Sequence, residues 1–176
     1  AKVDIFTIYQ ELYNYTFLDA VKELANRAGI KIDFERTSNY KENDKYIKIL
    51  EISAKWFEEN LNVENNLCIR YLHNRNLSNE TIRAFRLGYS YNKDISLYEH
   101  LKSLSYTDEE ILKSNVAKLD KNKNIKDFFY KRLIFPITNI NGRVVGFGGR
   151  VLDESNPKYI NSQESHYFKK RNMLYN

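Results

Sequence analysis

The sequence predicts an α+β fold, in which a mainly helical first part is followed by a small antiparallel sheet with an Asn-Gly hairpin. Apolar residues recur at helical spacing through roughly the first two thirds of the chain. Two β-prone runs follow at residues 133–138 and 143–147, and Asn141-Gly142 between them is a strong signal for a tight turn. Six of the eight glycine and proline residues lie within residues 130–175, so the backbone is most constrained there.

Two helices are expected at the start of the chain. Residues 3–12 are rich in apolar side chains, and Thr16 is placed to cap a second helix that stops at Gly29. The second helix is expected to bury one face, formed by Phe17, Ala20, Val21, Leu24 and Ala28. Polar residues then become frequent, which predicts a linker at residues 33–42.

A long amphipathic helix is predicted over residues 43–59, and another helix follows over residues 67–72. The long helix is expected to turn inward Ile49, Leu50, Ile52, Trp56 and Phe57.

Three short helices complete the helical part. Ser78 is a candidate N-cap for the first, which we expect to close at Gly88 in the left-handed conformation. The second covers residues 97–104, and Thr107 opens the third with Glu110 in a capping box.

The hairpin region combines proline and glycine in an unusual density. Pro136 cannot donate a ladder hydrogen bond, so it predicts an edge strand or a bulge. Gly146, Gly148 and Gly149 allow close approach by another backbone or by a ligand; a bulged strand that needs positive φ explains them equally well.

The net charge of +5 is confined to one part of the chain. Residues 1–125 carry 19 basic and 19 acidic residues, whereas residues 126–176 carry 9 and 4. A cationic segment rich in tyrosine and phenylalanine favours an anionic partner with stackable faces, such as single-stranded nucleic acid.

Several other classes of protein are disfavoured. No apolar run approaches the roughly 20 residues that span a bilayer, and no secretory leader is evident, so a cytoplasmic protein without membrane contact is expected. Cys68 is the only cysteine and the three histidines are scattered, which predicts no metal site in these residues. No nucleophile triad or close acidic pair stands out, so no catalytic residue is predicted within the chain.

Long stretches of the sequence resemble bacterial replicative DNA primases of the DnaG type. The similar segments are RLIFPITNINGRVVGFGGRVL at 132–152, PKYINS at 157–162, YLHNRNLSNETIRAFRLGYS at 71–90, SYTDEEILKSNVAK at 105–118 and TFLDAVKELANRAGIKI at 16–32. The resemblance implies that residues 1–32 are the last helices of a zinc-binding domain, 33–42 a linker, and 43–176 the N-terminal subdomain of the catalytic core. A zinc ribbon would precede these residues, and the TOPRIM subdomain with the catalytic carboxylates would follow them.

The resemblance also assigns a basic, nucleic-acid-binding ridge. Matched one by one to the family's motifs, its residues are Arg75, Arg132, Arg150, Lys158, Tyr159, Asn161 and Lys170. The sequence departs from the family's usual residues at Tyr130, Asn76, Gln163 and the pair Arg171-Asn172.

The function implied is synthesis of short RNA primers on single-stranded DNA during replication, by a nucleotidyltransferase of which this segment alone is inactive. The implied partners are the template, the RNA primer, ribonucleoside triphosphates and, through regions outside this chain, the replicative helicase of the primosome. Mg²⁺ (or Mn²⁺) and Zn²⁺ would be bound outside these residues. The alternatives are a non-catalytic single-strand-binding module and a phage or plasmid primase-helicase.

Overall fold

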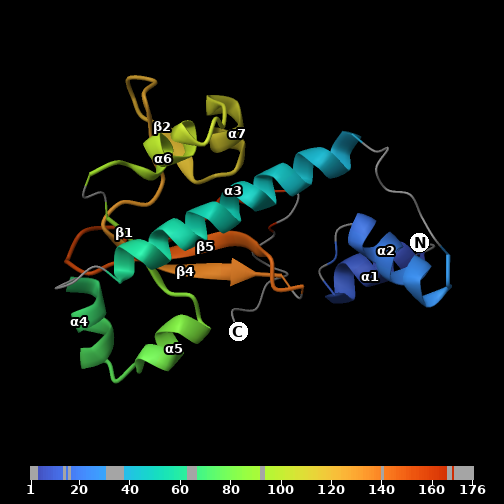
Figure 1. The fold of residues 1–176 in the computed structure, drawn as a ribbon, viewed down its shortest axis with the longest axis horizontal. Helices are drawn as coiled ribbons and strands as arrows, with labels where there is room; N and C mark the ends of the chain where they lie inside the picture. Colours follow the sequence, from blue (N-terminus) through green and yellow to red (C-terminus); the bar gives the residue numbers. More distant parts are fainter. Residues whose placement is uncertain are drawn as a thin grey trace.

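Figure 1 shows the fold in a computed structural model, which describes residues 4–13, 15, 17–30, 38–62, 67–91, 94–139, 141–165 and 168. The predicted α+β class is confirmed, because helices dominate the first part and an antiparallel sheet follows. Within these ranges, no helix combines the length and the apolar character needed to cross a bilayer.

The first two helices pack against each other to one side of the sheet (Figure 1). They are α1 (Ile5–Tyr13) and α2 (Phe17–Arg27). Of the face of α2 that was predicted to be buried, Ala20 is buried and Val21 and Leu24 are partly buried, whereas the prediction is wrong for Phe17 and Ala28, which are exposed near the two ends of the helix. Gly29 adopts a φ of 67° and ends the second helix as predicted. The predicted cap Thr16 lies outside the described residues.

Helix α3 (Ser38–Leu61) runs across the molecule and begins earlier than the predicted residue 43, inside the segment expected to be a linker. Its predicted inward face is confirmed, since Ile49, Leu50, Trp56 and Phe57 are buried and Ile52 is partly buried. The buried apolar residues of α3 extend from Tyr46 to Leu61, so this part of the helix is the central support of the fold.

The main sheet contains, in spatial order, β1 (Gly88–Ser90), β4 (Arg132–Thr138), β5 (Val144–Val151) and β6 (Tyr159–Asn161). Every neighbouring pair in it is antiparallel. The Asn141-Gly142 turn joins β4 to β5 as predicted, with Gly142 at a φ of 73°. Pro136 lies beyond the three residues that β1 pairs with, so its missing N–H leaves no gap in that ladder, and a register shift follows between Ile137 and Thr138.

The two faces of this sheet are covered by different helices. Ile134 faces α3 and its core, whereas the neighbouring Leu133 faces α4 (Leu67–Asn74) and α5 (Asn79–Ala84). Figure 1 shows the strands between α3 on one side and the α4–α5 pair on the other. Successive strand residues point to opposite faces, so each face carries its own set of side chains.

A second layer lies on the outer side of α3. It consists of α6 (Leu97–Ser103), α7 (Asp108–Lys113), β2 (Ala117–Leu119) and β3 (Ile125–Asp127). The predicted N-caps Ser78 and Thr107 are confirmed, and the Glu110 carboxylate completes the second of these as a capping box. The carboxylate of Asp127, the last residue of β3, accepts from two backbone N–H groups at the start of α6. This contact joins α6 to β3, the strand that precedes β4 in the chain.

The predicted helix end at Gly88 is wrong. The left-handed residue after α5 is Arg86, with a φ of 51°, and Gly88 instead begins β1. A Cβ on Gly88 would lie 2.4 Å from the Phe57 Cβ, so glycine is required because α3 passes directly over the strand. A salt bridge from the Arg86 guanidinium to Glu51, with Nη2 and Oε1 2.6 Å apart, holds the helix in this position.

Candidate nucleic-acid interface

The strand register brings two predicted residues together on the sheet face that points toward α4. Arg150 of β5 lies directly opposite Tyr159 of β6, and Leu133 of β4 continues the row. Arg150 Nε donates to the Tyr159 hydroxyl at 3.1 Å, and its guanidinium carbon lies 5.8 Å from the centre of the Tyr159 ring. The arginine is half-buried, whereas Tyr159 is 60% exposed. Its ring is therefore available for stacking on a planar ligand.

Helix α4 adds a second arginine and another ring to this face. Tyr71 lies one helical turn before Arg75, whose guanidinium carbon is 5.3 Å from the centre of the Tyr71 ring. The guanidinium carbon of Arg150 lies 4.7 Å from the same ring. Two cations from different elements thus meet at one tyrosine. Asn76 adopts a φ of 60°, which asparagine tolerates better than most other side chains.

Strand alternation places Asn161 on the same face as Tyr159, opposite Gly148. A Cβ on Gly148 would lie 3.2 Å from the Asn161 Oδ1, so glycine leaves this side of β5 uncovered. We call the surface formed by Tyr71, Arg75, Arg150, Tyr159 and Asn161 the arginine–tyrosine face. Among the described residues, no carboxylate pairs with either of its arginines, so their charge is available to an anion.

Arg132 lies on the opposite face of the sheet and is only 8% exposed. Its Nη1 donates to the carbonyls of Gly149 and Lys158, both at 3.4 Å, and Nη2 donates to the carbonyl of Pro157 at 3.0 Å. Burial lowers the pKa of this guanidinium, with Asp153 opposing the shift. The sequence grouped Arg132 with the surface cations, but the structure places it inside, where it holds the segment that carries Lys158.

Lys158 itself is exposed immediately before β6. Its carbonyl accepts from the Val151 N–H at 3.1 Å as well as from Arg132, so its backbone is fixed from two sides. The remaining predicted residue, Lys170, lies outside the described residues, as do Arg171 and Asn172. The structure therefore brings together Arg75, Arg150, Tyr159 and Asn161, and separates Arg132 from them.

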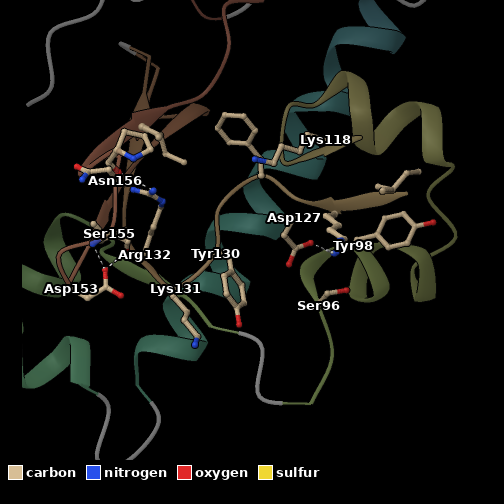
Figure 2. A pocket seen from close by; sticks show the side chains of 16 residues that line it. Ser96, Tyr98, Lys118, Asp127, Tyr130, Lys131, Arg132, Asp153, Ser155 and Asn156 are labelled. Carbon is tan, nitrogen blue, oxygen red and sulfur yellow. Dashed lines mark hydrogen bonds between the residues drawn. The ribbon is translucent and has the colours of Figure 1, made fainter. Parts of the chain in front are cut away.

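An open groove of about 850 Å³ lies on the Arg132 side of the sheet. Figure 2 shows Arg132 and Asn156 on one wall, with Lys118 and Asp127 on the other. Two cation–aromatic contacts border it, from Lys118 to Phe128 and from Lys131 to Tyr130, each 5.4 Å from nitrogen to ring centre. Because the Asp127 carboxylate caps α6, the lining presents more unpaired cations than anions.

Sequence reasoning missed Tyr71 and, apart from Arg132, the residues of this groove. Tyr71 precedes Arg75 by four residues on a predicted helix, a spacing that brings side chains together, so this contact had a recognisable signal. The groove had no such signal, because residues 125–132 are joined by tertiary packing to lining residues distant in sequence, such as Tyr98 and Asn156. Within the part of the chain that the structure describes, no group of three or more His, Cys, Asp or Glu side chains could hold a metal ion.

Residues 56–176 match a family model described as the N-terminal domain of the DNA primase catalytic core. A DNA primase from Clostridium acetobutylicum is 38% identical over 176 residues, which cover 98% of this chain and 29% of that protein. A DNA primase from Thermotoga maritima is 34% identical over 175 residues, covering 99% and 31%. The chain thus spans about a third of the length of these curated relatives.

Solved structures give the same result. The Aquifex aeolicus primase, comprising zinc-binding and RNA polymerase domains, aligns with a TM-score of 0.66 and 30% identity over 98% of this chain and 42% of that one. A DnaG primase catalytic domain bound to single-stranded DNA aligns with a TM-score of 0.67 and 29% identity, over 77% and 44%.

Proposed function

Because the chain belongs to the DNA primase family, we propose that it is the template- and primer-binding part of an enzyme that makes short RNA primers on single-stranded DNA. Residues 1–32 would be the end of a zinc-binding domain, 33–42 the connection, and 43–176 the N-terminal subdomain of the catalytic core. Ribonucleoside triphosphates would be the substrates. The replicative helicase would bind elsewhere on the full-length protein, which would act in the cytoplasm.

We propose that Mg²⁺ (or Mn²⁺) and Zn²⁺ are bound by other segments of the full-length enzyme. Mg²⁺ takes oxygen ligands and structural Zn²⁺ takes cysteine and histidine. Among the described residues, no group of three or more His, Cys, Asp or Glu side chains could hold a metal ion. The role of this chain is to bind and orient the nucleic acid.

The arginine–tyrosine face supports this role most directly. Among the described residues, no carboxylate competes for the guanidinium groups of Arg75 and Arg150, so those N–H groups that are neither bonded to Tyr159 nor enclosed can donate to phosphate oxygens. The exposed Tyr159 ring offers a stacking surface for a base, and the Asn161 amide offers both a donor and an acceptor for a base edge or a sugar hydroxyl. Phosphate contacts set position and stacking tolerates any base, which suits an enzyme that reads many templates.

Lys158 and the groove extend the cationic surface beyond this face. Lys158 is exposed at a backbone position that Arg132 fixes, so Arg132 contributes to binding indirectly. The groove lies on the other side of the same strands, and its lysines would contact a second stretch of the nucleic acid. Lys170 remains a proposed contact.

The observation that carries the proposal is the meeting of Arg75, Arg150 and Tyr159 on one face in a member of this family. In the full-length protein, Arg150→Ala and Lys158→Ala should each weaken single-stranded DNA binding about tenfold at low salt and reduce the salt dependence. Lys55→Ala is the matched control, because Lys55 is an exposed cation on α3, away from this surface.

Primer synthesis from ribonucleoside triphosphates distinguishes an enzyme from a binding module. We expect the full-length protein to make primers and the Arg150→Ala variant to make far fewer at limiting template. Unchanged binding and primer yield in both variants would refute the assignment of this face. Tight binding without any primer synthesis by the full-length protein would favour the non-catalytic alternative.

A further inference from the structure

Packing alone does not explain why residue 71 of the arginine–tyrosine face is a tyrosine. It belongs to α4 and packs partly buried against the apolar cluster around Leu72 and Leu133. A leucine would fill such a place equally well for packing alone. The aromatic ring nevertheless contacts the guanidinium groups of both Arg75 and Arg150, which come from elements far apart in the sequence.

Two like charges held beside one ring need an attraction that offsets their repulsion. The negative face of a tyrosine ring supplies it, because the ring quadrupole attracts a guanidinium cation. A carboxylate would do the same but would occupy the N–H donors that an incoming phosphate must use. A ring holds the guanidinium by its face and leaves its edge donors free.

The hydrogen bonds of Arg150 agree with a guanidinium that is held through its face by the Tyr71 ring. Its Nε donates to the Tyr159 hydroxyl, while its Nη1 is enclosed and has no hydrogen-bond acceptor among the described residues. Enclosing a donor without an acceptor is costly, and the attraction to the Tyr71 ring offsets part of that cost. The guanidinium is thereby kept in one orientation before any ligand arrives.

We propose that Tyr71 is a positioning residue for nucleic-acid binding, whose ring fixes Arg75 and Arg150 relative to each other so that both meet phosphates of one strand. This inference rests on the proposed function, since it assumes that the two arginines bind phosphate. It assigns the effect to the ring and not to the hydroxyl. A prearranged pair of cations loses less side-chain freedom on binding than two independent ones.

The test compares ring-retaining and ring-removing variants in the full-length protein, with fluorescent oligothymidylate as the probe and anisotropy as the readout. Tyr71→Phe should stay within about twofold of the unaltered protein. Tyr71→Leu should weaken binding about fivefold at low salt, and the slope of log affinity against log salt should become shallower by about one.

Two further variants separate the possible failures. Ile69→Ala disturbs the same apolar cluster without touching either arginine. If it weakens binding and flattens the salt slope as much as Tyr71→Leu does, the role of Tyr71 is structural and the inference is overturned. Arg150→Ala tests the proposed nucleic-acid binding on which this inference rests.

If Arg150→Ala weakens binding while Tyr71→Leu does not, the nucleic-acid surface stands and the positioning role falls. If neither variant changes binding, the proposed function itself falls. The double variant Tyr71→Leu/Arg150→Ala should bind more tightly than the product of the single losses predicts, because both changes disrupt the same contact. Independent, multiplicative losses would contradict the coupling.

Discussion

On the α3 side of the sheet, the rings of Phe57, Phe129 and Phe147 pack edge to face in a closed core, whereas on the α4 side the Tyr71 and Tyr159 rings are partly exposed and contact Arg150. Each face receives one arginine from the same hairpin. On the α3 side the guanidinium of Arg132 donates to three backbone carbonyls at the wall of the groove. On the open side the guanidinium of Arg150 keeps donors available.

The difference follows from a single step of strand register. Arg132 pairs with Val151 and Leu133 pairs with Arg150, so the two arginines are one residue out of phase and point to opposite faces. From residue type and surrounding motif alone, both arginines were expected to bind nucleic acid. Whether an arginine can bind a ligand or instead supports the fold depends on its face of the sheet. On one face the side chain meets backbone carbonyl acceptors, and on the other it meets solvent.

The largest effect expected from this comparison comes from the adjacent glycines of β5. A Cβ on Gly149 would lie 2.6 Å from the Phe129 Cδ1 and 3.1 Å from the Arg132 Cδ, inside the closed face. Gly149→Ala should therefore destabilise the protein by about 3 kcal/mol, since overpacking a core forces its neighbours out of place. Urea unfolding followed by the fluorescence of Trp56, the only tryptophan, measures the change.

Gly148→Ala is the matched control on the open face. Its Cβ would approach the Asn161 Oδ1 at 3.2 Å, and an amide at the end of a side chain can rotate away. We expect a stability change well under about 1 kcal/mol, together with weaker single-strand binding. Equal destabilisation by the two substitutions would remove the distinction between the faces.

The next effect is on the arginines themselves. Arg132→Met should lower stability by about 2 kcal/mol, because it leaves the carbonyls of Gly149, Pro157 and Lys158 without a donor. Arg150→Met should leave stability nearly unchanged and mainly weaken nucleic-acid binding. Unfolding and binding measured on both variants form the check. If Arg132→Met leaves stability unchanged but strongly weakens binding, Arg132 contacts the nucleic acid directly and our structural interpretation is wrong.

Local signals in the sequence located the helices, although the start of α3 and the end of α5 were predicted incorrectly. Ser78 and Thr107 cap helices through contacts to residues three positions away, and such contacts can be recognised without a fold. The strands β1, β2, β3 and β6 were not predicted, because three residues show too little alternation. Gly88 was misassigned for a different reason: glycine is required there by the close approach of Phe57 on α3, which is distant in sequence.

The candidate site divides along similar lines. Arg75, Arg150, Tyr159 and Asn161 were predicted from the family resemblance and are brought together by the sheet register and α4. The burial of Arg132 could not be predicted, because its acceptors are backbone carbonyls of a loop that folds back 25 residues later. Ring-to-cation contacts such as that between Tyr71 and Arg150 likewise depend on how α4 packs against the sheet.

The smallest effect concerns Cys68, a fully buried residue of α4 that packs in the same apolar cluster as Leu133. Burial raises the pKa of its thiol to about 12, whereas an unfolded thiol titrates near about 8.5. Between these values the folded protein keeps a proton that the unfolded chain loses, so stability should fall as pH rises, by about 1.4 kcal/mol per pH unit from this group.

Cys68→Ala should remove that slope, although it costs stability at neutral pH by leaving a small cavity. Urea unfolding of both proteins at pH 9 and pH 10 measures the difference, and titration of the tyrosines cancels between them. Parallel losses in the two proteins would show that the core beneath α4 admits the charged thiolate, and would make the two faces of the sheet less different than their packing indicates.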